Sequence, residues 1–225
     1  MKKLNRNLAV KPSFLNNMYH TTHTWKHMTQ AKKRHVWKEL GKFQNGLCVY
    51  CESKAVKGKN LGHIEHFYDK STHANLTFDW NNLFGCCDSK FHCGHYKDQT
   101  LPGGIRRKYN VNLLIKPDVE DPENYFQFFP SGKIEKKHGL STLDEQKAIE
   151  TIKALKLDDS SLERSREQQI THFQSRVSAA LSIIDNEDDE ETIVLAISEY
   201  TEIEQEAKTA LHRTAIKQAV IWMTN

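Results

Sequence analysis

The sequence predicts an α+β fold in its first part and an all-helical fold in its second. Three observations indicate this division. All five cysteines lie between residues 48 and 93, among short apolar runs and turns. Toward the C-terminus, apolar residues recur with the helical period of 3.6. The charge also changes, because residues 1–110 carry 19 Lys/Arg against 7 Asp/Glu, and residues 111–225 carry 13 against 22. We therefore expect a basic domain over 1–140 and an acidic helical one over 141–225.

The first domain is expected to hold its cysteines between one long helix and short strands. A helix is indicated by apolar residues at helical spacing, namely Trp25, Met28, Val36, Trp37 and Leu40. Asn45-Gly46 predicts a turn that leads the chain to the first cysteine pair. The expected elements are a helix over 25–43, a strand over 63–68, a second strand or turn over 79–84 and a short helix from Cys93.

The second domain is expected to consist of helices that follow a hairpin. Residues 125–135 combine aromatics with a Pro-Ser-Gly turn, which is typical of a hairpin. Thr142 and Glu145 have the spacing of a capping box for a helix. The apolar stripes that follow predict helices carrying Ile149, Ile152 and Leu155, then Leu162 to Ile184, then residues 191–206 and 208–223.

The composition restricts the environment of the chain and the chemistry of its cysteines. No apolar run approaches the roughly 20 residues that span a bilayer, and no secretory signal is visible, so we expect a cytoplasmic protein without a membrane segment. Thiols stay reduced in that compartment. An odd number of clustered cysteines then favours metal binding over disulfides.

The first cysteine pair and the histidines after it are similar to a two-cysteine, two-histidine zinc finger. Cys48 and Cys51 are followed, after eleven residues, by His63 and His66. Such fingers usually have about twelve residues between the pairs and three to five between the histidines. In a strand, moreover, His63 and His66 would point to opposite faces. The finger is therefore disfavoured, and we expect His63 to be structural.

A four-cysteine zinc site accounts for the cysteines better. Cys48 and Cys51 would pair with Cys87 and Cys93, and four thiolates would close the shell of a structural zinc ion. Such a site would hold two loops together. Cys86 adjoins Cys87 and is the alternative ligand. We expect Cys86 to be a small buried apolar residue.

Four segments resemble the HNH endonuclease subunit of Septu-type and retron-associated anti-phage systems. They are GLCVYCE (46–52), IEHFYDKS (64–71), FDWNNLFGCC (78–87) and CGHYKD (93–98). The resemblance continues more weakly through YFQFFPSGKI and KALKLDDSSLERSR. It implies a ββα-metal nuclease core between zinc knuckles, and a metal-dependent hydrolysis of phosphodiester bonds in an anti-phage defence complex.

The resemblance also implies a role for each residue of the nuclease site. His66 would be the general base, since an imidazole with a pKa near 6.5 accepts a proton at neutral pH. Asn82 would place its carbonyl against that ring, with the adjacent Asn81 as the alternative. Glu65 and His95 would hold a catalytic Mg2+ or Mn2+ ion that activates water and stabilises charge on the phosphate.

The sequence departs from the family pattern at two positions. Gly94 follows Cys93 directly, where many relatives have His or Asn, so that His95 is shifted by one residue. Asp69 stands where relatives often have proline. Four further residues are candidates for contacts with phosphate groups: Lys70, Lys97, Arg106 and Arg107.

The acidic helices are expected to bind a protein partner. The chain has no G-x-x-x-x-G-K-[ST] phosphate loop, and the resemblance implies a separate ABC-type ATPase subunit. Retron versions would add a reverse transcriptase and its DNA/RNA. HNH chemistry can cut DNA or RNA, and the defensive role that the resemblance implies is compatible with phage DNA or a host RNA such as tRNA. The alternative function is a non-catalytic, zinc-stabilised nucleic-acid-binding module or adaptor.

Overall fold

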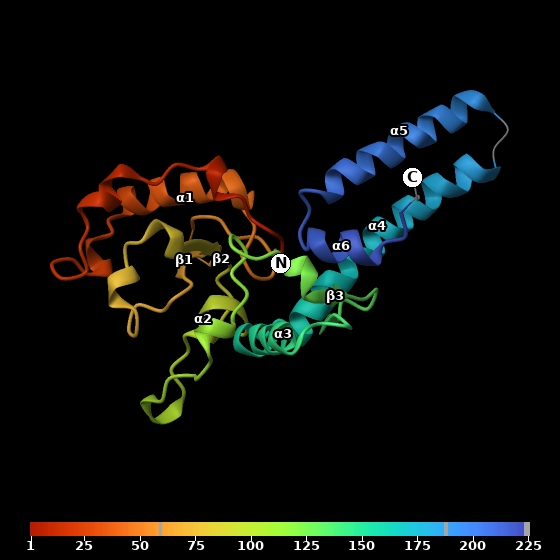
Figure 1. Ribbon diagram of the computed structural model, residues 1–225. Coiled ribbons are helices and arrows are strands. Elements are labelled where there is room, and N and C mark those ends of the chain that lie inside the picture. The colour runs from red at the N-terminus through yellow and green to blue at the C-terminus, as the bar shows by residue number, and fades with distance from the viewer. Residues whose placement is uncertain (59, 187–188, 223–225) are drawn as a thin grey trace. The chain divides into compact units, whose positions relative to one another are not determined.

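The computed structural model describes residues 1–58, 60–186 and 189–222 (Figure 1). Their contacts divide the chain into two compact units. The first contains residues 1–126 together with 136–159, and the second contains residues 127–135 together with the chain from Ser160 onward. None of the described helices is both long enough and apolar enough to cross a membrane.

The first unit is a mixture of helices, short strands and loops. Its regular elements are α1 (Gln30–Gln44), β1 (His63–His66), β2 (Leu83–Cys86), α2 (Cys93–Lys97) and α3 (Thr142–Leu155). Short 3-10 helices lie before and between these elements, at Arg6–Leu8, Ser13–Asn17, Trp25–His27, Ala74–Leu76, Trp80–Asn82, Pro102–Gly104, Val111–Leu113 and Pro122–Asn124. The expectation of mixed helix and strand is thus confirmed for this part of the chain.

Helix α1 begins later than the apolar pattern predicts. Residues 25–27 form a separate 3-10 turn, and the side chain of Thr29 accepts a hydrogen bond from the Lys32 amide and so caps α1. Asn45 ends the helix in the left-handed conformation, with φ 56°. Val36 and Leu40 are buried as expected.

Strands β1 and β2 pair antiparallel, with His63 opposite Cys86 and His66 opposite Leu83. The last residue of α1 extends this small sheet. The side-chain amide of Gln44 donates from Nε2 to the Gly85 carbonyl and accepts at Oε1 from the Gly85 backbone amide, both at 2.8 Å. These two hydrogen bonds imitate those of a neighbouring strand. A Cβ at Gly85 would lie 2.7 Å from the Trp37 ring, so only glycine fits there. Helix α1 therefore fixes the position of β2.

Helix α3 begins one residue earlier than the predicted capping box implies. Ser141 is the N-cap, and its hydroxyl accepts from the Asp144 amide, so the capping box at Thr142 and Glu145 is wrong. Ile149 is 48% exposed, whereas Leu155 is buried. Thr151 accepts a hydrogen bond from the Ile115 amide at 2.9 Å and so ties α3 to the first unit. Apart from hairpin residues 127–135, the second unit therefore begins after residue 159, whereas the sequence predicts a domain boundary after residue 140.

The second unit contains α4 (Ser160–Asn186), α5 (Glu190–Ala207) and α6 (Arg213–Ala219). Helices α4 and α5 lie side by side, and α6 packs against both (Figure 1). Their buried side chains come from the predicted stripes, and include Leu162, Ile170, Phe173 and Val177 of α4 and Ile203 of α5. Residue 223, at the end of the last predicted helix, lies outside the described residues. The predicted hairpin consists of β3 (Phe126–Phe128) and β4 (Ile134–Lys136).

Candidate active site and metal centres

Four cysteines from two distant parts of the first unit form a buried cluster. Cys48 and Cys51 lie in the loop after α1, Cys87 follows β2, and Cys93 begins α2. Their sulfur atoms all lie within 4.8 Å of one another. Four thiols at such separations fit the tetrahedral shell of a structural zinc ion. The structure thus gathers the set that the spacing predicts, and its occupation by zinc stays a prediction.

The backbone around these cysteines folds in a way that suits thiolates. The Tyr50 amide donates to the Cys48 sulfur at 3.4 Å. Glu52 and Cys93 adopt the left-handed conformation, with φ 62° at each, and so turn the chain sharply beside the cluster. His92 Nδ1 lies 3.2 Å from the Cys93 sulfur. These contacts orient the sulfurs before any metal binds.

Cys86 lies beside the cluster without belonging to it. Its sulfur is 3.7 Å from the Cys48 sulfur and accepts a hydrogen bond from the Gly94 amide at 3.4 Å. The group of four closely spaced sulfurs contains Cys87 instead. Both neighbours thus lie near the cluster, and the mutual spacing of the four sulfurs favours Cys87 as the ligand.

A buried ion pair joins α2 to β1. Lys97 is completely buried, and its Nζ lies 3.1 Å from Glu65 Oε1 and 2.7 Å from Asp98 Oδ1. It also donates to the His66 carbonyl at 3.2 Å. Burial alone would raise the pKa of Glu65, but the charge of Lys97 and the hydrogen bond to His63 lower it to about 2. Both partners are therefore charged at neutral pH.

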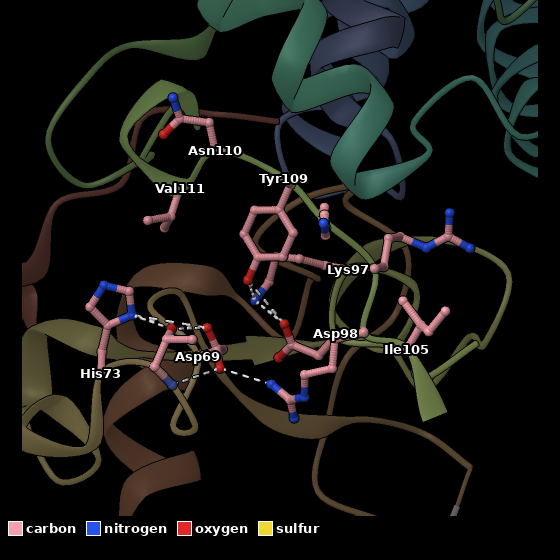
Figure 2. A pocket seen from close by; sticks show the side chains of 12 residues that line it. Asp69, His73, Lys97, Asp98, Ile105, Tyr109, Asn110 and Val111 are labelled. Carbon is pink, nitrogen blue, oxygen red and sulfur yellow. Dashed lines mark hydrogen bonds and ion pairs between the residues drawn. The ribbon is translucent and has the colours of Figure 1, made fainter. Parts of the chain in front are cut away.

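The burial of Lys97 differs from its expected place at the surface. Its side chain faces the interior of the first unit, where Tyr109 also contributes its hydroxyl at 3.3 Å (Figure 2). A phosphate contact would require Lys97 to leave Glu65 and Asp98. Its role in nucleic-acid binding stays a prediction that the observed contacts do not favour.

His66 is a buried, neutral imidazole at the end of β1. Its Nε2 lies 3.0 Å from the Thr77 carbonyl, and Trp25 packs edge-on against the ring at 4.4 Å between centroids. Because a carbonyl only accepts, Nε2 carries the proton, and the lone pair of Nδ1 faces Lys70 Nζ at 3.4 Å. Burial, followed by the positive charge of Lys70, lowers the pKa of His66 to about 3. The ring is therefore uncharged at neutral pH, and in the free protein Nδ1 is a weaker base than an ordinary imidazole nitrogen.

Asn82 positions the loop between the strands instead of the His66 ring. Its carbonyl oxygen accepts from the Tyr68 amide at 2.7 Å, and its Nδ2 donates to the carbonyls of Tyr68 and Leu76. The expected contact of the carbonyl with the His66 ring is therefore wrong. The His66 ring instead hydrogen-bonds to the carbonyl of Thr77, the residue after Leu76.

A second group of metal-ligating residues lies on the other face of β1. It consists of His63, Asp88 and His95, with ligand atoms within 4.8 Å of one another. His95 Nε2 lies 2.9 Å from Asp88 Oδ1, and the rings of His63 and His95 stack at 3.9 Å. From the sequence, His63 is expected to be structural, and Asp88 is not among the predicted site residues. The only sequence signal for Asp88 is its place directly after Cys87.

Gly94 explains why the third motif histidine is displaced. A Cβ at residue 94 would lie 2.2 Å from Glu65 Oε2 and 2.9 Å from His63 Nε2. The side chains of β1 thus occupy the space that any side chain at residue 94 would need. His95, one residue later, reaches Asp88 instead.

The other basic candidates lie at or near a pocket of about 740 Å3 (Figure 2). Arg106 pairs with Asp69 at 2.9 Å, and Arg107 lies over the Tyr96 ring at 3.7 Å. Lys70 is exposed, and its Nζ lies 3.4 Å from His66 Nδ1. The pocket also contains Tyr109 and is lined mainly by polar and basic side chains. Their contact with nucleic acid stays a prediction.

Removing the charge of Lys97 should destabilise the first unit strongly. The variant Lys97→Met leaves Glu65 buried and ionised without its partner, which costs about 3–5 kcal/mol of unfolding free energy. Urea denaturation measures the change. Lys90→Met, at an exposed lysine, is the control and should shift stability by less than about 0.5 kcal/mol. Equal stability of the two variants would contradict the assignment.

The two adjacent cysteines should differ in their effect on bound zinc. Cys87→Ser removes a ligand of the cluster and should abolish tight zinc binding, whereas Cys86→Ser should keep one equivalent. Metal analysis after dialysis against a weak chelator provides the measurement. Loss of zinc from Cys86→Ser alone would show that Cys86 is the ligand.

Two curated proteins are similar to this chain, and no model of a known protein family matches it. "Septu protein PtuB" of Bacillus thuringiensis is 28% identical over 97 residues, which are 43% of this chain and 34% of that protein. "Retron Vc95 putative HNH endonuclease" of Vibrio cholerae serotype O1 biovar El Tor is 30% identical over 146 residues, which are 64% of this chain and 67% of that protein. The chain thus spans about a third of the first relative and two thirds of the second. It belongs to the family of PtuB-like HNH defence proteins.

Proposed function

We propose that the chain is a metal-dependent HNH endonuclease that hydrolyses phosphodiester bonds of nucleic acid in an anti-phage defence complex. The observation that carries the proposal is the uncharged His66 ring, whose Nε2–H is held by the Thr77 carbonyl and whose unprotonated Nδ1 faces Lys70. The relatives named for Septu and retron systems support the nuclease assignment. In this proposal β1, β2 and α2 are the ββα-metal core.

His66 would act as the general base through Nδ1. The Thr77 carbonyl holds Nε2–H and thereby aims Nδ1 away from β1, and Asn82 fixes the loop that carries Thr77. Lys70 Nζ lies 3.4 Å from Nδ1 in the free protein. A substrate phosphate would draw the ammonium of Lys70 toward itself, so that Nδ1 could take a proton from the attacking water.

A divalent ion at the His95 end of the site would stabilise negative charge on the phosphate and help the leaving oxygen. His95 and Glu65 are the ligands that the family pattern implies. Glu65 already binds Lys97 and His63, and only 3% of its side chain is exposed. The protein's own contribution is therefore to keep Glu65 charged, ordered and shielded from water.

Arg106, Arg107 and Lys70 are the proposed contacts with the substrate backbone. Guanidinium groups form paired hydrogen bonds with phosphate oxygens, and Asp69 already holds Arg106 in place. Such contacts carry no sequence information, which suits both DNA and RNA such as tRNA. Binding should weaken steeply with salt.

We also propose that the helices of the second unit dock a protein partner, an ABC-type ATPase, and in retron systems a reverse transcriptase with its DNA/RNA. The names of the two relatives support a multi-component defence system. Helix α5 exposes Val194, Leu195 and Ile197 by 59%, 65% and 45%. Exposed apolar side chains on an acidic helix are typical of a protein interface.

The competing function is a nucleic-acid-binding module without catalysis. The four-cysteine cluster is compatible with this alternative, because a closed thiolate shell stabilises a fold without supplying catalytic chemistry. Binding that persists in EDTA, with no cleavage under any metal condition, would support this alternative.

His66→Ala should reduce cleavage by about 10^2- to 10^4-fold, because the general base is lost while the zinc cluster and the strand pairing remain. Cleavage of single- and double-stranded DNA and of tRNA, followed on gels with Mg2+ or Mn2+, measures the effect. His35→Ala, at an exposed histidine of α1, is the matched control and should cleave normally. Full activity of folded, zinc-loaded His66→Ala would refute the mechanism.

A further inference from the structure

We propose that His63, Asp88 and His95 hold one divalent cation of the borderline class to which Mn2+ and Zn2+ belong, and that Glu65 orients His63 without touching the ion. The inference deepens the proposed function and rests on it for the role of the ion in cleavage. The binding site itself follows from the geometry of these four side chains.

The separations of the three ligands suit one ion. His95 Nε2 lies 2.9 Å from Asp88 Oδ1, and His63 Nδ1 lies 3.8 Å from the same oxygen. An ion with bonds of about 2.1 Å brings adjacent ligand atoms to roughly 3.0–3.4 Å from each other. The stacked rings of His63 and His95 turn their nitrogens toward the same carboxylate. Small rotations of the side chains would complete the coordination.

His63 has one nitrogen that the protein leaves without a hydrogen bond. Among the described residues, Nδ1 is shielded from solvent and lacks a hydrogen-bond partner. Its other nitrogen, Nε2, lies 3.2 Å from Glu65 Oε2. Buried polar atoms in folded proteins are almost always satisfied, so an imidazole nitrogen that has no hydrogen bond and lies beside a carboxylate and a second imidazole is suited to coordinate a cation.

Glu65 has the contacts of an orienting residue. Its Oε1 accepts from the Tyr50 hydroxyl at 3.3 Å and pairs with Lys97 at 3.1 Å. Its Oε2 faces His63 Nε2, and Gly94 closes the space beside it. A carboxylate on the far nitrogen of a metal-bound histidine fixes the tautomer that leaves the near nitrogen free. Here that near nitrogen is Nδ1.

The donor set determines the class of ion. Two imidazoles and one carboxylate suit Mn2+, Zn2+ and related ions, whereas Mg2+ prefers oxygen ligands in an octahedral arrangement. The side chains of Asp88 and His95 are 30% and 40% exposed, so the remaining coordination positions face solvent. Water and a phosphate oxygen can occupy them. The site is therefore open, in contrast to the closed four-cysteine cluster.

The test is metal binding by the full-length, zinc-loaded protein without nucleic acid. Mn2+ titration followed by electron paramagnetic resonance should show one bound equivalent in the wild type. His63→Ala, Asp88→Ala and His95→Ala should each weaken Mn2+ binding by more than about 100-fold, and Mg2+ should compete at least about 10-fold less well than Zn2+. His73→Ala, a half-buried histidine outside the group, is the control and should bind normally.

Glu65→Gln separates an orienting role from direct ligation. We expect the affinity for Mn2+ to fall by about 10- to 100-fold, while the protein still binds one equivalent of Mn2+ at saturation. Losses of this size are typical when the hydrogen-bond partner of a metal-bound histidine is changed. Unchanged affinity, or loss as complete as in His63→Ala, would overturn the orienting role. The absence of bound Mn2+ in the wild type, or normal binding by folded, zinc-retaining His95→Ala and Asp88→Ala, would overturn the site. Cleavage is not measured, so a failure of the nuclease proposal stays distinguishable.

Discussion

The ion pair between Lys97 and Glu65 is the contact on which the candidate site depends. Two charges out of water are tolerated only when each is fully paired, and these two share a network with His63, Asp98 and the His66 carbonyl. The pair holds α2 against β1. It thereby positions the residues of both faces of β1, with the His66 ring on one and the imidazoles of His63 and His95 on the other.

The sequence predicts the elements of the first unit because their signals are local. Turn residues, helical periodicity and the cysteine spacing indicate α1, the strands and the four-cysteine cluster, and the structure shows each of them near its expected place. The errors fall where a local signal has several solutions. Ser141 and Thr142 can both cap a helix, and α3 has a stripe that could pack on either unit, so its tertiary contacts decided its place.

The parts of the site that sequence reasoning missed arise from contacts between distant residues. Asp88 meets His63 only because the register of β1 and β2 places Cys86 opposite His63, two residues before Asp88. Lys97 resembles any surface lysine until the charge of Glu65 is placed beside it. The sequence predicts a contact of Asn82 with the His66 ring, whereas its amide binds the backbone of Tyr68 and Leu76, because an amide can bind a ring or a backbone equally well.

The most direct test of the account is the position of metal ions around β1. Crystals of the zinc-loaded protein soaked in Mn2+, with anomalous scattering recorded at the Zn and Mn edges, would locate both. We expect zinc among Cys48, Cys51, Cys87 and Cys93, and manganese bound by His63 Nδ1, Asp88 and His95, with Glu65 still paired to Lys97. Manganese bound directly by Glu65, with Lys97 displaced, would contradict the central role of the ion pair.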